Sequence, residues 1–206
     1  MNPKAKRIGV FGGAFDPPHN AHVVLAQTAL AELELDVLHV IPTGQAWHKA
    51  RTLSAPEHRL AMTQLAFADV PGVLVDDREI KRVGPTFTID TLQALQAENP
   101  SAQLYLMMGA DQFVAFKQWH QWQMIMKSAI ICIAARAGFY WPEGQFDSLN
   151  MPENRLLMLK MPQLVVSATQ IRQLLTGGLG ENHVMTDLLP YPVASYIAQH
   201  QLYRAA

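Results

Sequence analysis

Residues 8 to 22 read IGVFGGAFDPPHNAH, and this stretch decides the fold that the rest of the chain is expected to join. Ile8 to Phe11 is rich in β-branched and aromatic residues, which predicts a buried first strand. Gly12 and Gly13 follow at once, and they allow the backbone to turn sharply and to approach a ligand without an intervening Cβ. The glycine pair therefore predicts a gap of about the size of a phosphate group at the end of the strand.

A helix is expected directly after this turn, with two histidines at its start. The two prolines before His19 prevent an earlier beginning, so the helix should open near Asn20, which would cap it, and continue over residues 21–33. His19 and His22 are three positions apart and therefore share one face. Because a helix N-terminus carries free N–H groups and a partial positive charge, both imidazoles can point at a bound anion.

The same residues also have an ordinary interpretation. A glycine pair is a common turn, and a lone histidine after a strand is more often a cap or a core group. The combination of strand, glycines, prolines and His-x-x-His favours a ligand site, because open α/β sheets bind ligands at the carboxyl ends of their strands. The stretch is neither a Walker A loop nor a G-x-G-x-x-G fingerprint, since it lacks the required lysine or third glycine.

The composition is that of one globular domain over residues 1–206. The chain is 50% hydrophobic with a net charge of -1, which excludes a basic nucleic-acid-binding protein. No stretch resembles a signal peptide or a membrane span, so neither nucleic acid nor membrane is an expected partner. Cys132 lies in an apolar run and is expected to be a buried thiol in a reducing compartment, with the cytoplasm as the expected location.

Further strands and helices are expected to alternate along the chain. Strands are predicted at 37–41, 73–75, 104–108 and 130–134, and helices at 56–68, 88–97 and 121–127. Ser54 stands at capping-box spacing from Glu57, with a proline in the first turn between them. The alternation predicts an α/β fold with a parallel sheet, and a surface loop is expected over 138–154.

Two motifs far apart in the chain resemble one known superfamily. The stretch from Gly12 to His22 resembles the signature of the nucleotidylyltransferases, whose usual form is histidine or threonine, any residue, glycine, histidine. The stretch Val166-Ser167-Ala168-Thr169-Gln170-Ile171-Arg172 resembles the element that holds the ATP phosphates in that superfamily. Two positions depart from the pattern, with Ala21 in place of the glycine and Ala168 in place of a hydroxyl residue.

Within the superfamily, the whole chain most resembles the bacterial nicotinate mononucleotide adenylyltransferases. The likeness rests on residues 47–49, Arg59, residues 84–92, 109–111, Trp119 and the ending from Leu188 to Tyr203. It implies a Rossmann-like parallel sheet with helices on both faces and a small helical C-terminal part at about 165–206, which carries the second phosphate motif. It also implies transfer of AMP from ATP to nicotinate mononucleotide in NAD biosynthesis, with ATP and nicotinate mononucleotide as partners; a homodimer stays open.

The implied chemistry needs positioning rather than a strong base. The attacking phosphate is already an anion near neutral pH, because its second pKa is about 6. The protein must align two polyanions and neutralise the charge that grows on the α-phosphate and on pyrophosphate. By resemblance, His19, His22, Lys49 and Arg172 are the catalytic candidates, with His22 on the α-phosphate and the two cations on the β- and γ-phosphates.

The remaining site residues are also assigned by resemblance. ATP is expected to contact Gly12, Gly13, Phe15, His19, His22, Asp111, Ser167, Thr169 and Arg172. The acceptor is expected to contact Ala14, Lys49, Thr86, Phe87, Thr88 and Trp119, with the Trp119 ring stacked on the nicotinate and backbone N–H groups of 86–88 receiving its carboxylate.

Several of these residues also have an ordinary interpretation. Ser167 can cap a helix at 168–176, where Thr169 and Arg172 share the first turn. The alternatives are an ordinary capped helix with an exposed arginine, a solvated Lys49, and Asp111 as a helix cap.

Magnesium is expected to arrive with ATP rather than in a site of the protein's own. Mg²⁺ often binds through substrate phosphates with one or two carboxylates, so no dense acidic cluster is required, and the scattered histidines show no zinc spacing. Two alternatives to the nicotinate acceptor remain. The acceptor could be phosphopantetheine or nicotinamide mononucleotide, or the chain could bind ATP as a sensor without turnover.

Overall fold

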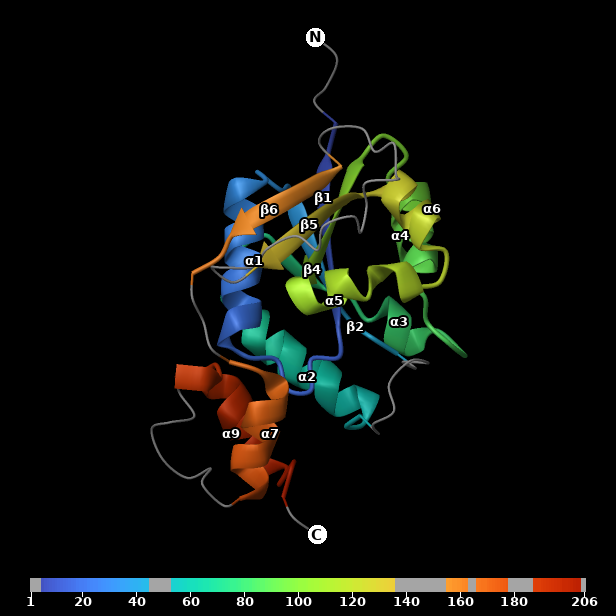
Figure 1. The fold of residues 1–206 in the computed structure, drawn as a ribbon. Helices are drawn as coiled ribbons and strands as arrows, with labels where there is room; N and C mark the ends of the chain where they lie inside the picture. Colours follow the sequence, from blue (N-terminus) through green and yellow to red (C-terminus); the bar gives the residue numbers. More distant parts are fainter. Residues whose placement is uncertain (1–4, 45–52, 136–154, 163–165, 178–186, 205–206) are drawn as a thin grey trace.

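The computed structural model describes residues 5–44, 53–135, 155–162, 166–177 and 187–204. Its centre is a six-stranded, wholly parallel sheet with the strand order β3-β2-β1-β4-β5-β6 (Figure 1). The strands are β1 (Arg7–Gly13), β2 (Val37–Pro42), β3 (Val73–Val75), β4 (Gln103–Gly109), β5 (Ile130–Ala135) and β6 (Leu156–Lys160). This confirms the α/β, Rossmann-like parallel sheet.

Helices connect the strands from β1 to β5, two further helices follow β6, and the described helices cover both faces of the sheet. They are α1 (Asn20–Glu32), α2 (Pro56–Phe67), α3 (Arg78–Lys81), α4 (Thr88–Glu98), α5 (Ala110–Val114), η1 (Phe116–Gln118), α6 (Trp122–Ser128), α7 (Ala168–Thr176) and α9 (Tyr191–Gln199). Figure 1 shows α7 and α9 together beside α2, at the end of the molecule toward which β1 runs. The helical C-terminal part is therefore at the edge of the sheet where ligands are expected.

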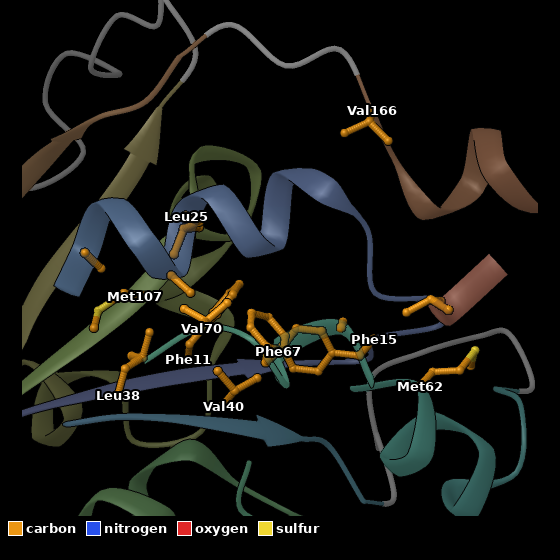
Figure 2. Close-up of a cluster of buried hydrophobic side chains, with 14 of the residues drawn as sticks. Phe11, Phe15, Leu25, Leu38, Val40, Met62, Phe67, Val70, Met107 and Val166 are labelled. Atoms are coloured by element: carbon orange, nitrogen blue, oxygen red, sulfur yellow. The ribbon is translucent and has the colours of Figure 1, made fainter. Parts of the chain in front are cut away.

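Two apolar clusters lie on opposite faces of the sheet. The first packs Phe11, Leu38 and Val40 of the sheet against α1 and α2, and it continues into Ile171 and Val193 of the C-terminal helices (Figure 2). The second packs the other face against α4, α5, η1 and α6. Alternating side chains of one strand enter different clusters, which is why β1 reads as a continuous apolar run.

The predicted elements are confirmed with small changes at their ends, and three details are wrong. Both glycines belong to β1, where Gly12 pairs with Ile41, so the strand continues through them instead of turning. His19 rather than Asn20 is the N-cap of α1, because His19 has an extended backbone and Asn20 is already the first helical residue; the Asn20 side chain donates to the Asp187 carbonyl oxygen at 2.9 Å.

The third wrong detail is the start of α2, whose N-cap is Ala55, with no side-chain capping bond from Ser54. Cys132 is buried as expected, and burial raises the pKa of its thiol to about 12. None of the helices in the described part of the chain combines the length and apolar character that a membrane span requires. Lys49 and the predicted loop 138–154 lie outside the described residues.

Candidate active site

The carboxyl ends of β1 and β2 form the floor of the candidate site. Gly13 pairs with Pro42, and the Thr43 N–H donates to the Gly13 carbonyl oxygen at 2.8 Å. β1 lies between β2 and β4: the chain runs from β1 through β2 to β3 on one side of the sheet and then crosses to β4 on the other side. Open α/β sheets leave a crevice for ligands at this reversal of strand order. A Cβ built on Gly12 would have no atom within 4 Å, so the strand end is open there, as expected.

The sharp turn after β1 is made at Phe15, which has a φ of 47°. The Phe15 ring is buried and stands edge-on to the rings of Phe11 and His22, with centroid distances of 5.4 and 5.1 Å. Figure 2 shows it beside Phe67 in the first apolar cluster. A nucleotide could meet Phe15 only through its backbone, while the ring supports His22.

The two histidines stack on each other at the start of α1. Their ring centroids are 3.6 Å apart at an interplanar angle of 23°. The His19 backbone N–H donates to Nδ1 of His22 at 3.1 Å. Because Nδ1 of His22 accepts this bond, the neutral ring carries its proton on Nε2, which can donate to a ligand.

Burial sets the charge of this pair. It lowers the pKa of His19 to about 4, and burial together with the neighbouring His19 lowers the pKa of His22 well below its usual value. His19 Nδ1 is buried with no hydrogen-bond partner among the described residues. Near pH 7 both rings are therefore neutral in the free protein, and they offer N–H donors rather than two positive charges to an anion.

The second motif lies directly against the first. Ser167 caps α7 as predicted, with its Oγ accepting from the Gln170 N–H at 3.2 Å. Arg172 donates to Thr169 Oγ1 at 3.1 Å, so these two residues share a face. Arg172 also donates to the backbone oxygen of Asp16 at 2.7 Å, which joins α7 to the loop before α1. The fold thus brings the two sequence motifs into contact.

Asp16 is a junction that the motifs alone did not reveal. Its carboxylate is 1% exposed and accepts from the Tyr203 hydroxyl at 2.6 Å and from the Ser54 N–H at 3.3 Å. Burial and the adjacent Asp16 raise the pKa of Tyr203 above its usual value. The only sequence signal for this contact is the Leu-Tyr pair in the chain's ending.

Arg59 is a second residue whose role only the fold reveals. Its guanidinium is 1% exposed and donates to the carbonyl oxygens of Ala14 at 3.1 Å, Thr43 at 2.6 Å and Ser54 at 3.0 Å. It thereby ties the loops after β1 and β2 to the start of α2. A buried arginine bonded to loop carbonyls holds backbone in place, which is what a preorganised site requires.

The residues expected to hold the acceptor lie on the other side of Thr43. Thr43 Oγ1 and Thr86 Oγ1 are 3.3 Å apart, which places residues 86–88 beside the end of β2. The Phe87 ring lies 4.3 Å from that of His120, next to the half-buried Trp119. Ala14 is linked to residues 86–88 through Arg59 and Thr43, and Trp119 is linked to them through its neighbour His120.

The structure also bears on the alternative role of Asp111 as a helix cap and on the departure from the family pattern at Ala21. Asp111 lies exposed in the first turn of α5, whose N-cap is Gly109, so Asp111 does not cap that helix. The half-buried Ala21 packs against the first apolar cluster, which accommodates the methyl group that departs from the family pattern.

The described residues contain no group of three or more His, Cys, Asp or Glu side chains that could hold a metal ion. Asp16 is 1% exposed, and its two carboxylate oxygens accept from the Tyr203 hydroxyl and the Ser54 N–H. A magnesium ion held by the nucleotide's own phosphates requires no such group.

Known proteins are similar to this chain over most of its length. The model of the cytidylyltransferase-like family matches residues 10–174, which include both motifs. A probable nicotinate-nucleotide adenylyltransferase of Albidiferax ferrireducens is 53% identical over 201 residues, covering 98% of this chain and all of the relative. The chain belongs to the nicotinate-nucleotide adenylyltransferase family. A member from Neisseria meningitidis is 35% identical over 203 residues, covering 96% of this chain and 98% of that relative.

Solved structures share the nicotinate-nucleotide adenylyltransferase fold at low sequence identity. The Plasmodium falciparum nicotinic acid mononucleotide adenylyltransferase complexed with NaAD matches with a TM-score of 0.80 at 20% identity, covering 96% of this chain and 97% of that chain. A putative nicotinate-nucleotide adenylyltransferase from Vibrio parahaemolyticus matches with a TM-score of 0.66 at 19% identity, covering 98% and 97%. At these identities the likeness concerns the fold alone.

Proposed function

We propose that this chain transfers the AMP group of ATP to nicotinate mononucleotide, with release of pyrophosphate, as a step of NAD biosynthesis. The observation that carries the proposal is the 2.7 Å bond from Arg172 to the Asp16 backbone, which joins the two phosphate motifs at the carboxyl edge of the sheet. Relatives over the full length of the chain bear the corresponding name. Cys132 is the only cysteine of the chain, and its buried free thiol is compatible with a reducing compartment. We therefore propose that the protein is located in the cytoplasm.

In the proposed reaction, a phosphate oxygen of nicotinate mononucleotide attacks the α-phosphorus of ATP. A new P–O bond forms while the bond from the α-phosphorus to the bridging oxygen breaks, and pyrophosphate carries the electron pair away. The attacking oxygen is already ionised near neutral pH, so no residue has to remove a proton. Binding and orientation of the two anions are then the main tasks of the protein.

Each phosphate motif has a separate part in this proposal. His22 donates from Nε2 to the α-phosphate, where charge develops in the transition state, and His19 donates beside it. The N–H groups at the start of α1 and α7 face the triphosphate, with Ser167 and Thr169 at the latter. Arg172 and Lys49 neutralise the β- and γ-phosphates, and Mg²⁺ bound to ATP supplies further charge neutralisation there.

The acceptor side of the proposal rests on residues 86–88 and Trp119. Backbone N–H groups of the loop receive the nicotinate carboxylate, and the Trp119 ring stacks on the pyridine. An ionised carboxylate makes charge-assisted hydrogen bonds with these donors, whereas the amide of nicotinamide mononucleotide forfeits a bond or turns its own NH₂ against them.

A pyrophosphate-release assay with ATP and each acceptor in turn tests this function. We expect nicotinate mononucleotide to exceed nicotinamide mononucleotide in kcat/KM by about 10² or more, because the wrong group leaves buried donors unpaired. Trp119→Ala should weaken both acceptors alike, since it removes stacking area and not the groups that recognise charge. Equal use of both nucleotides would contradict the nicotinate assignment, and ATP binding without turnover would make the chain a sensor.

A further inference from the structure

A buried carboxyl group meets three threonine hydroxyls behind the loop at residues 84–88, which we call the acceptor loop. The carboxyl belongs to Glu79 of α3 and is 7% exposed. Thr91 Oγ1 of α4 donates to its Oε1 at 2.8 Å, and the Thr43 and Thr86 hydroxyls are close enough to help stabilise the ionised carboxylate. Thr86 and Thr91 are themselves buried. The proposed mechanism assigns no role to Glu79.

Thr43 connects the cluster to the phosphate side of the site. Its backbone N–H donates to Gly13 at 2.8 Å, and its carbonyl oxygen accepts from Arg59 at 2.6 Å. Its hydroxyl lies 3.3 Å from that of Thr86 in the acceptor loop. A continuous series of short contacts therefore runs from the glycines of β1, through Thr43, to the acceptor loop and Glu79.

The backbone after β2 is also fitted to Glu79. A Cβ on Gly44 would overlap the backbone oxygen of Glu79, so only glycine allows α3 to approach this closely. Burial raises the pKa of Glu79, while its threonine partners and the nearby charge of Arg82 oppose that rise. A carboxyl placed against this desolvation cost needs its hydrogen-bond partners, and here those partners come from three separate segments.

We propose that Glu79 is a positioning residue that holds the acceptor loop in register with the phosphate site and thereby sets acceptor affinity and selectivity. This inference rests on the proposed function. Glu79 accepts from Thr91 of α4 and lies against the segment after β2, where Thr43 meets Thr86 of the acceptor loop, so removing its carboxyl loosens the support of the loop on both sides. Donors that are displaced by even 1 Å lose much of their effect on a reacting or bound group.

The test measures KM for ATP and for each pyridine nucleotide with Glu79→Gln and Glu79→Ala. Glu79→Gln keeps the volume but turns an NH₂ toward hydroxyls that now donate. We expect Glu79→Ala to raise the KM for nicotinate mononucleotide about tenfold and to reduce the preference for it over nicotinamide mononucleotide. The KM for ATP should change by less than about twofold. Glu79→Gln should change the same values in the same direction, by about threefold.

Asp76→Asn is the matched control, because Asp76 is also a partly buried carboxylate, just before α3, but bonds to His39 and Arg78 instead. It should lower the melting temperature without changing the ratio of the two KM values. Equal increases in both KM values for the Glu79 variants, or an unchanged acceptor KM, would overturn the proposal. If the unmodified protein uses a different acceptor, the proposed function fails separately, and the KM split for that acceptor still decides the role of Glu79.

Discussion

Nδ1 of His22 accepts a hydrogen bond from the His19 backbone, and this single contact determines which nitrogen can serve a ligand. The ring is neutral because burial and its neighbour lower its pKa, so its donor is an Nε2–H group rather than an imidazolium. A neutral donor contributes most where negative charge increases during the reaction, which is at the α-phosphate. His22 therefore differs from the arginine of the site: it offers a neutral N–H donor and not a permanent positive charge.

Replacing His22 with Ala removes this donor. We expect kcat to fall by about 10²-fold or more, as for loss of one oxyanion donor, with a smaller change in the KM for ATP. Steady-state kinetics at saturating nucleotide measures the effect. His39→Ala serves as a control, because His39 lies on β2 and its ring bonds to Asp76, which follows β3, instead of lying beside His19. A His22→Ala enzyme with unchanged kcat would show that the ring does not act on the α-phosphate.

His19 should make stability depend on pH. Its pKa is about 4 in the folded protein and 6.5 when unfolded, so the unfolded state binds more protons between these values. The free energy of unfolding therefore falls as pH decreases from 6.5 toward 4, by at most about 3 kcal/mol. Urea unfolding at several pH values measures how steeply the free energy of unfolding depends on pH. This dependence should be weaker for His19→Asn than for His120→Asn, a control at an exposed residue. Parallel slopes would contradict this.

At the scale of elements, two helix starts form the site, and only one of them was predicted with its correct cap. Ser167 caps α7 through a bond within its own first turn, which sequence spacing reveals. The cap of α1 is His19, since the helix already starts at Asn20, whose side chain bonds to Asp187, far away in the chain. Local sequence patterns predict hydrogen bonds within a helix turn, but they do not predict a side-chain bond to a residue far away in the chain.

Arg172→Ala tests how α7 contributes. In the proposed function the Arg172 guanidinium lies near the triphosphate and supports ground-state binding of ATP, and its bond to the Asp16 backbone holds the two motifs together. We expect the KM for ATP to rise by about tenfold or more, with the acceptor KM little changed. Arg172→Lys should restore ATP binding only in part, because lysine lacks the fork that reaches Thr169 and Asp16 together. A rise confined to the acceptor would place Arg172 in the other pocket.

At the scale of the whole molecule, Tyr203 in the C-terminal part is hydrogen-bonded to Asp16 in the first motif. The Tyr203 hydroxyl donates to a carboxylate that is 1% exposed, so the C-terminal part and the loop before α1 share one buried bond. The first apolar cluster also extends into α7 and α9. Formation of the phosphate site therefore depends on docking of the C-terminal helices.

Tyr203→Phe removes only the hydroxyl. A buried carboxylate that loses a partner costs about 1–3 kcal/mol, which lowers the melting temperature by several degrees for a chain of this length. The KM for ATP should rise as well, because Asp16 also receives Arg172. Tyr196→Phe is the control, since its hydroxyl bonds to His58 between α2 and α9. If both variants lower stability but neither changes the KM, Tyr203 has a structural role only.

By itself, the sequence determined the parallel sheet, most of its strands, the start of α7 and the pairing of two motifs with one family, because these depend on local periodicity, capping and short spacings. It did not predict β6 or the short helix α3, whose few residues carry too weak a pattern. The contacts of Asp16, Arg59 and Glu79 were decided by tertiary structure alone. Each joins segments separated widely in the chain, and a buried charge finds such partners only once the fold has brought them together.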